Sequence, residues 1–160
     1  MDTGTPMDGD IRETFWNAFQ ASPFIMMTLI GPGGHAEPMT ARLDRDAHHV
    51  IWFYCKRDNR IAAGGRAMGQ IMTRGHDVFA CLEGILAEET DPTRREKHWS
   101  NAVEAWLPGG KSDPSVMMLR FDIADGEVWT ANLGLKGAFK LMSGRPIHPH
   151  EAGRHALGAV

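Results

Sequence analysis

The stretch that decides the fold lies between Trp99 and Trp129 and reads WSNAVEAWLPGGKSDPSVMMLRFDIADGEVW. Residues 91–106 predict an amphipathic helix, with a proline at its first helical position. A loop rich in proline and glycine follows this helix. Two apolar runs, 116–123 and 127–131, then predict a β-hairpin around an Ala-Asp-Gly turn. This part of the chain therefore passes from one helix into a pair of antiparallel strands.

Local signals predict the remaining elements. Strand composition between turn residues predicts five strands, at 24–30, 35–43, 50–55, 70–73 and 78–86. Helical spacing or capping predicts three helices: 10–21 with Asp10 as its N-cap, a weak one at 58–67, and a short one at 135–142. Gly84 stands where a bulge or bend suits a barrel strand. Together these elements predict an α+β fold that is mainly β, an antiparallel barrel of six to seven strands with flanking helices, in preference to a doubly wound parallel sheet.

Size and composition indicate one globular domain. We expect the domain to span residues 1–143 and a tail rich in Gly, Pro and His, 144–160, to be flexible. The net charge of −3 argues against a nucleic-acid partner, which requires a basic face. No apolar run approaches the roughly 20 residues of a membrane helix. The N-terminus lacks the features of a secretory signal, and two cysteines make no disulfide framework, so we expect a cytoplasmic protein without a membrane partner.

A series of short motifs in the opening stretch resembles a known family. The series is Trp99, Ala105-Trp106, Pro108-Gly109-Gly110-Lys111, Asp113-Pro114 and Glu127-Val128-Trp129. It resembles the second half of the general stress proteins, which belong to the pyridoxamine 5′-phosphate oxidase-like, FMN-binding split-barrel superfamily. The resemblance covers residues 15–142. It implies a split β-barrel, FMN as the cofactor in preference to FAD or haem, and a homodimer with the flavin between its subunits.

The same resemblance implies which residues bind the flavin. Two segments, Pro38-Met39-Thr40 and Trp52-Phe53-Tyr54-Cys55, stand where the family lines the flavin ring and ribityl chain, partly through backbone groups. In the second segment Tyr54 and Cys55 are the candidate site residues. Asn59-Arg60 stands where the family places the lysine that holds the phosphate. Arg42 and Arg57 could assist, because a guanidinium group binds phosphate through two parallel hydrogen bonds.

Three positions depart from the family pattern: Glu37 replaces an arginine, Cys55 a hydroxyl residue and Arg60 the lysine. A carboxylate facing the phosphate would repel it, so either Glu37 points away or FMN binding is weakened. Without the resemblance, the arginines read as ordinary solvated surface side chains. Trp106 has two interpretations of equal weight, a cover for the isoalloxazine edge from the partner subunit or aromatic packing at a helix end.

Residues typical of metal and redox sites are present, but their placement argues against both kinds of site. His48 and His49 are consecutive in the sequence, so in a strand they point to opposite faces. The remaining histidine cluster, His148, His150 and His155, lies in the predicted tail, so we expect no metal site. Cys55 and Cys81 have apolar neighbours on predicted strands and read as inert.

The resemblance implies a flavin-dependent oxidoreductase that moves hydride between a reduced nicotinamide and an unidentified small acceptor. Because the flavin carries this chemistry, no residue is assigned as catalytic. A true pyridoxamine 5′-phosphate oxidase is not expected, because residues 144–150 read GRPIHPH where those enzymes have a strand rich in Arg and Trp. Two alternatives stay open: a flavin-binding stress or sensor protein without turnover, and a barrel that binds another planar ligand such as haem.

Overall fold

The centre of the molecule is an antiparallel sheet that curls until its two ends meet. The computed structural model describes residues 8–131, 154–158 and 160. Within these residues the elements, in chain order, are α1 (Gly9–Ala21), β1 (Phe24–Leu29), β2 (Glu37–Thr40), β3 (Val50–Lys56), β4 (Gly65–Met72), β5 (Val78–Glu88), α2 (Pro92–His98), α3 (Asn101–Trp106), β6 (Val116–Thr130) and β7 (Arg154–Gly158). The helix predicted at 135–142 lies outside the described residues.

The strand order explains how the sheet becomes a barrel. It runs β2-β1-β4-β5-β6-β3, with β7 added beside β6, and every pair is antiparallel. The two ends meet at one bridge, where the N–H of Arg42 donates to the Trp52 carbonyl at 2.7 Å and the N–H of Trp52 donates to the Arg42 carbonyl at 3.0 Å. The barrel is therefore joined at this bridge and split beside it. The predicted fold class, a mainly β α+β fold with an antiparallel split barrel, is confirmed.

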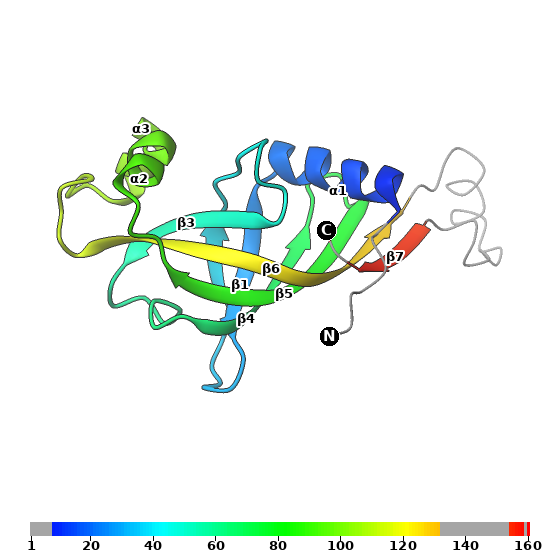
Figure 1. Cartoon of the computed structure of the whole chain (residues 1–160), viewed down its shortest axis with the longest axis horizontal. Helices are drawn as coiled ribbons and strands as arrows, with labels where there is room; N and C mark the ends of the chain where they lie inside the picture. The colour runs from blue at the N-terminus through cyan, green and yellow to red at the C-terminus, as the bar shows by residue number, and fades with distance from the viewer. Residues whose placement is uncertain (1–7, 132–153, 159) are drawn as a thin grey trace.

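A single large core fills the barrel. Ile11, Phe15 and Phe19 form the buried face of α1 and belong to the same core as the inward residues of the strands. A smaller cluster that includes Val103 and Leu107 attaches α3 to the start of β6. Figure 1 shows α1 lying along one part of the sheet and α2 and α3 beyond its other end. None of the described helices is long and apolar enough to cross a membrane.

β6 is one continuous strand where the sequence predicted a hairpin, so that prediction is wrong. Residues 124–126 stay in the sheet, since Asp125 lies opposite Glu83 and Gly126 opposite Leu82 of β5. The register shifts between Glu83 and Gly84, which leaves one extra residue on β6. The Ala-Asp-Gly signal thus marks a bulge, and the bulge expected at Gly84 is confirmed.

The helix predicted at 58–67 is also wrong, because this segment forms turns and then enters β4 at Gly65. Gly64 and Gly65 have φ values of 70° and 110°, which lie outside the helical region. A side chain at Gly64 would meet the Leu86 carbonyl oxygen at 2.5 Å. The close approach of Gly64 to the β5 backbone therefore leaves no room for a side chain at this position.

Two other helices differ from the prediction in their boundaries. The helix predicted at 91–106 is divided into α2 and α3, because Ser100 starts a new helix by accepting a hydrogen bond from the N–H of Val103. α1 begins at Gly9, and its N-cap is Asp8, whose side chain accepts from the N–H of Asp10. The predicted N-cap, Asp10, is therefore wrong by two residues.

Part of the predicted flexible tail, 144–160, belongs to the sheet. Arg154–Gly158 forms β7, which pairs with residues 126–130 of β6. Arg154 forms ion pairs with Asp8 and Asp10 at the start of α1, and Val160 is buried in the core. A short strand that is ordered by distant partners carries little local signal, which explains the correction. The domain border predicted at 143 lies outside the described residues.

Candidate functional site

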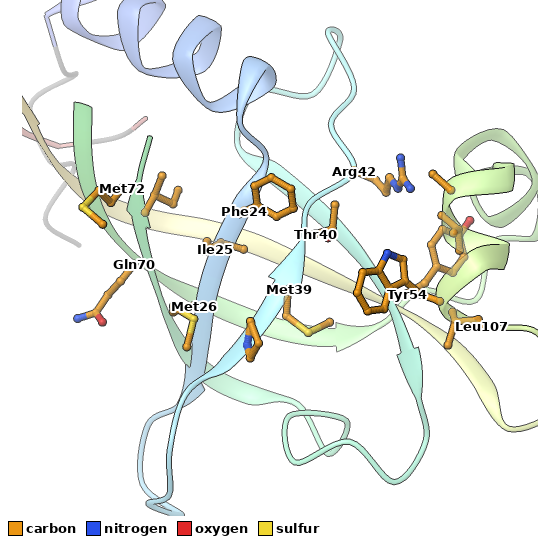
Figure 2. A pocket seen from close by; sticks show the side chains of 15 residues that line it. Phe24, Ile25, Met26, Met39, Thr40, Arg42, Tyr54, Gln70, Met72 and Leu107 are labelled. Carbon is orange, nitrogen blue, oxygen red and sulfur yellow. The ribbon is translucent and has the colours of Figure 1, made fainter. Parts of the chain in front are cut away.

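A cavity opens beside the split of the barrel, between the β1–β2 hairpin and α3. Its volume is about 790 Å³, within the range of small-molecule sites. Six of the ten residues predicted to bind the flavin line it: Pro38, Met39, Thr40, Arg42, Tyr54 and Trp106. Figure 2 shows Met39 and Thr40 on β2 across from Tyr54 and Leu107. The structure therefore brings most of the predicted site together from β2, β3 and α3.

The cavity wall is mainly apolar and partly open to solvent. Phe24, Met26 and Met72 line it from the outer face of the sheet, and each is exposed. Trp106 is 84% exposed although it ends a helix. This exposure excludes the interpretation of Trp106 as a packed helix-end aromatic. An open apolar wall of this kind is suited to a flat ring or to a second protein surface.

Arg42 is the one charged side chain among the described residues that line the cavity. Its backbone forms the bridge to Trp52, which fixes where the side chain begins. The guanidinium donates to the Ser100 hydroxyl at 3.4 Å, and among the described residues it forms no ion pair. It lies on the side of the cavity that faces the α2 and α3 helices (Figure 2). Arg42 is therefore able to donate hydrogen bonds to an oxygen atom of a ligand.

Tyr54 joins the cavity to the helices. Its hydroxyl donates a short hydrogen bond to the Arg95 carbonyl, and its ring meets Trp99 edge-on at 5.1 Å between centroids. Burial raises the pKa of Tyr54 to about 12, so the phenol stays neutral across the physiological range. Tyr54 thus contributes a fixed aromatic wall, and its proton is already engaged with α2.

Three of the residues expected at the phosphate, Arg57, Asn59 and Arg60, lie outside the cavity lining, whereas Arg42 is part of it. The Arg60 guanidinium forms an ion pair with Glu37 at 2.8 Å, and the Asn59 amide donates to the same carboxylate at 3.4 Å. Arg57 forms an ion pair with Glu88 at 2.8 Å. Glu37 therefore points at the predicted clamp, and both arginines already have carboxylate partners.

Cys55 is also predicted for the site but does not line the cavity. Its side chain is buried in the main core beneath β3, and burial raises the pKa of the thiol to about 12. A neutral, buried thiol is unreactive. Cys55 and Cys81 are both free.

In the part of the chain that the structure describes, no three His, Cys, Asp or Glu side chains converge into a possible metal site. His155 stacks on Trp129 and lies 2.6 Å from Glu127. His148 and His150 lie outside the described residues.

Nine of the lining residues were missed by sequence reasoning: Phe24, Ile25, Met26, Gln70, Ile71, Met72, Ala102, Val103 and Leu107. They come from β1, the end of β4 and α3. One signal was available, because residues 24–27 of β1 are apolar on both faces of the strand, whereas a strand with one face in water alternates. The other lining residues meet only through the tertiary fold.

The sequence profile described as "Pyridoxamine 5'-phosphate oxidase like" matches residues 10–144. The chain belongs to this family. Among solved structures of similar fold, a general stress FMN/FAD-binding protein from Xanthomonas citri has 38% sequence identity and a TM-score of 0.71, with 77% of this chain and 90% of that chain covered. A candidate general stress protein 26 from Jannaschia sp. CCS1 has 25% identity and a TM-score of 0.77, with 94% and 98% covered. No curated protein matches.

These comparisons confirm the resemblance on which the site was predicted. The chain matches the pyridoxamine 5′-phosphate oxidase-like family, and the solved structures similar to it include proteins of the general stress type. A flavin has an apolar planar ring and, in FMN, a charged phosphate. The cavity fits the ring, because its walls are mainly apolar and aromatic. The predicted phosphate clamp fits less well, because Arg57 and Arg60 are paired with carboxylates.

Proposed function

We propose that this chain binds FMN or a closely related flavin, with the ring in the cavity, and acts as a flavin-dependent oxidoreductase. The observation that carries the proposal is the cavity of about 790 Å³, whose wall contains the β2 segment predicted to line a flavin. Further support comes from the Xanthomonas citri protein, which is described as FMN/FAD-binding and is 38% identical over the matched region. A bound flavin would supply hydride transfer between a reduced nicotinamide and a small acceptor.

Each part of the wall has a distinct role in this proposal. Met39 and Tyr54 provide apolar and aromatic surface for the ring, and Thr40 provides backbone and hydroxyl groups beside it. Arg42 would donate to an oxygen atom of the ring, because it is the charged side chain that lines the cavity among the described residues. No described residue is proposed as a catalytic acid or base.

We further propose that the protein is a homodimer with the flavin between its subunits. Phe24, Met72 and Trp106 line the cavity and are 56%, 59% and 84% exposed. Large apolar side chains that are clustered and exposed mark interaction surfaces. A second copy of the chain would cover this open side and shield a bound ring from water.

The decisive experiment is a titration of the purified full chain with FMN, followed by quenching of flavin fluorescence. Saturable, stoichiometric quenching supports the proposal. Arg42→Gln should weaken FMN affinity about fivefold, since a donor to an uncharged oxygen contributes roughly 1 kcal/mol. Arg45→Gln is a matched control, because Arg45 is an exposed arginine that does not line the cavity. Absence of quenching by FMN, FAD and riboflavin would overturn flavin binding.

The second candidate is a flavin-binding stress or sensor protein without turnover. It is favoured by the state of Tyr54, whose pKa is raised by burial to about 12 and whose hydroxyl is engaged with the Arg95 carbonyl. A cavity without a side chain ready to transfer a proton is suited to binding. Oxidation of reduced nicotinamide by the flavin-loaded protein, with quinones and flavins tried as acceptors, separates the two functions.

A further inference from the structure

We infer that this site does not select for the flavin phosphate, so that uncharged riboflavin is held as tightly as FMN. The inference rests on the proposed function, because it concerns the flavin placed in that cavity. It depends on one feature of the structure: the two arginines predicted to bind the phosphate, Arg57 and Arg60, are both paired with carboxylates. We call residues 57–60, together with Glu37 and Glu88, the turn cluster.

Both arginines of the turn cluster are occupied. Arg60 forms an ion pair with Glu37 through Nε at 2.8 Å and donates from Nη1 to the His35 carbonyl at 3.2 Å. Arg57 donates to both oxygens of Glu88, at 2.8 and 3.3 Å, and from Nε to the Pro114 carbonyl at 3.1 Å. Arg57 therefore already uses a two-pronged pair of donors on Glu88. In Arg60 both Nε and Nη1 are engaged, so each two-pronged pair of donors includes one nitrogen that already has a partner.

The charges of the turn cluster do not favour an anion. Arg57 and Arg60 are positive, whereas Glu37, Glu88 and Asp58 are negative, so carboxylates outnumber cations. The Arg60 ion pair is partly exposed, and a pair of this kind is weak enough to open. Opening the pair would not remove the charge of Glu37, which would then lie beside the incoming phosphate and repel it.

Glu37 is held in place at the edge of the cavity. It begins β2, and it lies on the same face of that strand as Met39, which is part of the cavity wall. Its side chain is only 26% exposed, and Asn59 donates to it in addition to Arg60. A ligand tail that leaves the cavity past the start of β2 would therefore meet a carboxylate. A hydroxyl group can donate to that carboxylate, but a phosphate cannot.

Arg42 does not replace the missing clamp. It lies on the side of the cavity that faces the helices, with its guanidinium on the Ser100 hydroxyl (Figure 2). A single guanidinium balances at most half of the charge of a phosphate dianion. The geometry therefore points to a ligand recognised by its ring and its hydroxyl groups rather than by its phosphate.

The test compares the dissociation constants of riboflavin and FMN for the full chain, measured by flavin fluorescence quenching. The two constants should agree within about threefold, because the attraction of a phosphate to Arg60 and its repulsion by Glu37 offset each other. Raising the salt concentration from about 0.05 to 0.5 M screens both effects alike, so the ratio of the two constants should stay nearly unchanged. Glu37→Gln should tighten FMN about tenfold, since the amide keeps the shape but removes the repulsion. Riboflavin should change by no more than about threefold, because the amide oxygen still accepts a hydrogen bond from a hydroxyl group.

Glu83→Gln is the matched control. Glu83 pairs with Arg66 at the surface of β4 and β5 and does not line the cavity, so neither constant should move. The thermal unfolding midpoint of each variant shows whether it is folded. FMN binding that is ten or more times tighter than riboflavin binding in the natural protein would overturn the inference and leave flavin binding intact. An unchanged FMN to riboflavin ratio in Glu37→Gln would overturn its electrostatic cause, and no binding of either flavin would overturn the proposed function as well.

Discussion

Glu37 shows how one side chain can change a site without changing the fold. The sequence placed an acidic residue where an arginine was expected, and two outcomes were open, a carboxylate pointing away or a weakened phosphate site. The structure excludes the first geometry, because the Glu37 carboxylate lies 2.8 Å from the Arg60 guanidinium. Glu37 is accommodated because its neighbour Arg60 is a cation, so the ion pair costs little in stability. The pair also engages a guanidinium that was predicted to bind a phosphate.

Gly84 is the residue at which we expect the fold to be most sensitive. A methyl group there would lie 2.0 Å from the Asp122 carbonyl oxygen of β6, and this backbone cannot move without disturbing the bulge. Gly84→Ala should therefore lower the free energy of unfolding by about 2–3 kcal/mol, measured by urea denaturation. Gly9→Ala is the control, because nothing lies within 4 Å and α1 should be unchanged or slightly stabilised. Equal stability of Gly84→Ala and the natural protein would show that the bulge is not tight.

At the scale of elements, the sequence predicted what local pattern can determine. α1 was found from its buried face of Ile11, Phe15 and Phe19, and β3 from its unbroken β-branched and aromatic run. β6 was missed because Ala-Asp-Gly is a turn signal in isolation, and only pairing with β5 along its whole length shows that it is a bulge. The same limit applies to β7, which is ordered by β6 and by acidic residues at the far end of the chain.

The candidate site follows the same division. The β2 segment Pro38-Met39-Thr40 was predicted by family resemblance and does line the cavity. The wall formed by β1, β4 and α3 was not predicted, since it depends on where distant elements meet. The pairing of Arg60 with Glu37 was also beyond the sequence, because two residues separated by a long loop and a strand must be placed in space before their distance is known.

α2 is fastened to the barrel by a carboxylate, and its attachment should depend on pH. Asp44 forms ion pairs with Lys97 at 2.6 Å and Arg94 at 2.7 Å, and its side chain is 6% exposed. The hydrogen bond from Lys97, with help from the Asp46 N–H, lowers the pKa of Asp44 to about 2. The folded state therefore holds this carboxylate ionised at a pH where the unfolded chain protonates it. This contributes about 2 kcal/mol of stability above pH ~4, which is lost as the pH falls from about 4 to about 2.

Asp44→Asn should remove this contribution. We expect the variant to be less stable than the natural protein by about 1–2 kcal/mol at pH 6, with the difference shrinking as the pH approaches about 2.5, measured as urea midpoints. Other carboxyls titrate in the same range, including Glu88, whose pKa is lowered by its hydrogen bond from Arg57, so the difference between the two curves isolates Asp44. Asp46→Asn, an exposed neighbour without an ion pair among the described residues, should follow the natural curve. A stability difference between Asp44→Asn and the natural protein that stays the same at every pH would contradict the assignment of this contribution to Asp44.

For the whole molecule, the split of the barrel and the cavity have one origin. β2 and β3 meet only through the bridge between Arg42 and Trp52, and the strands diverge beyond it. α3 stands beside this bridge, and apolar residues of β1, β2, β4 and α3 line an open cavity between them. A fold that fails to close at one seam therefore provides a ligand site and an exposed apolar rim in the same place.

The exposed rim leads to the last prediction, which concerns assembly. Met72 is 59% exposed at the end of β4 and lines the cavity, so a charge there should oppose any second copy that covers it. Met72→Asp should convert the protein from dimer to monomer at about 10 μM in sedimentation velocity, because interfaces of standard size depend on a desolvated apolar centre. FMN affinity should fall in parallel, since the open side of the cavity loses its cover.

Ile85→Asp is the matched control for that change. Ile85 is 49% exposed and apolar but does not line the cavity, so its substitution tests whether any exposed apolar residue has the same effect. A dimer that survives in Ile85→Asp but not in Met72→Asp places the interface at the cavity. A natural protein that sediments as a monomer at about 100 μM would contradict the dimer, since stable interfaces hold at far lower concentrations. The flavin would then have to be bound by one chain alone, with Trp106 exposed beside it.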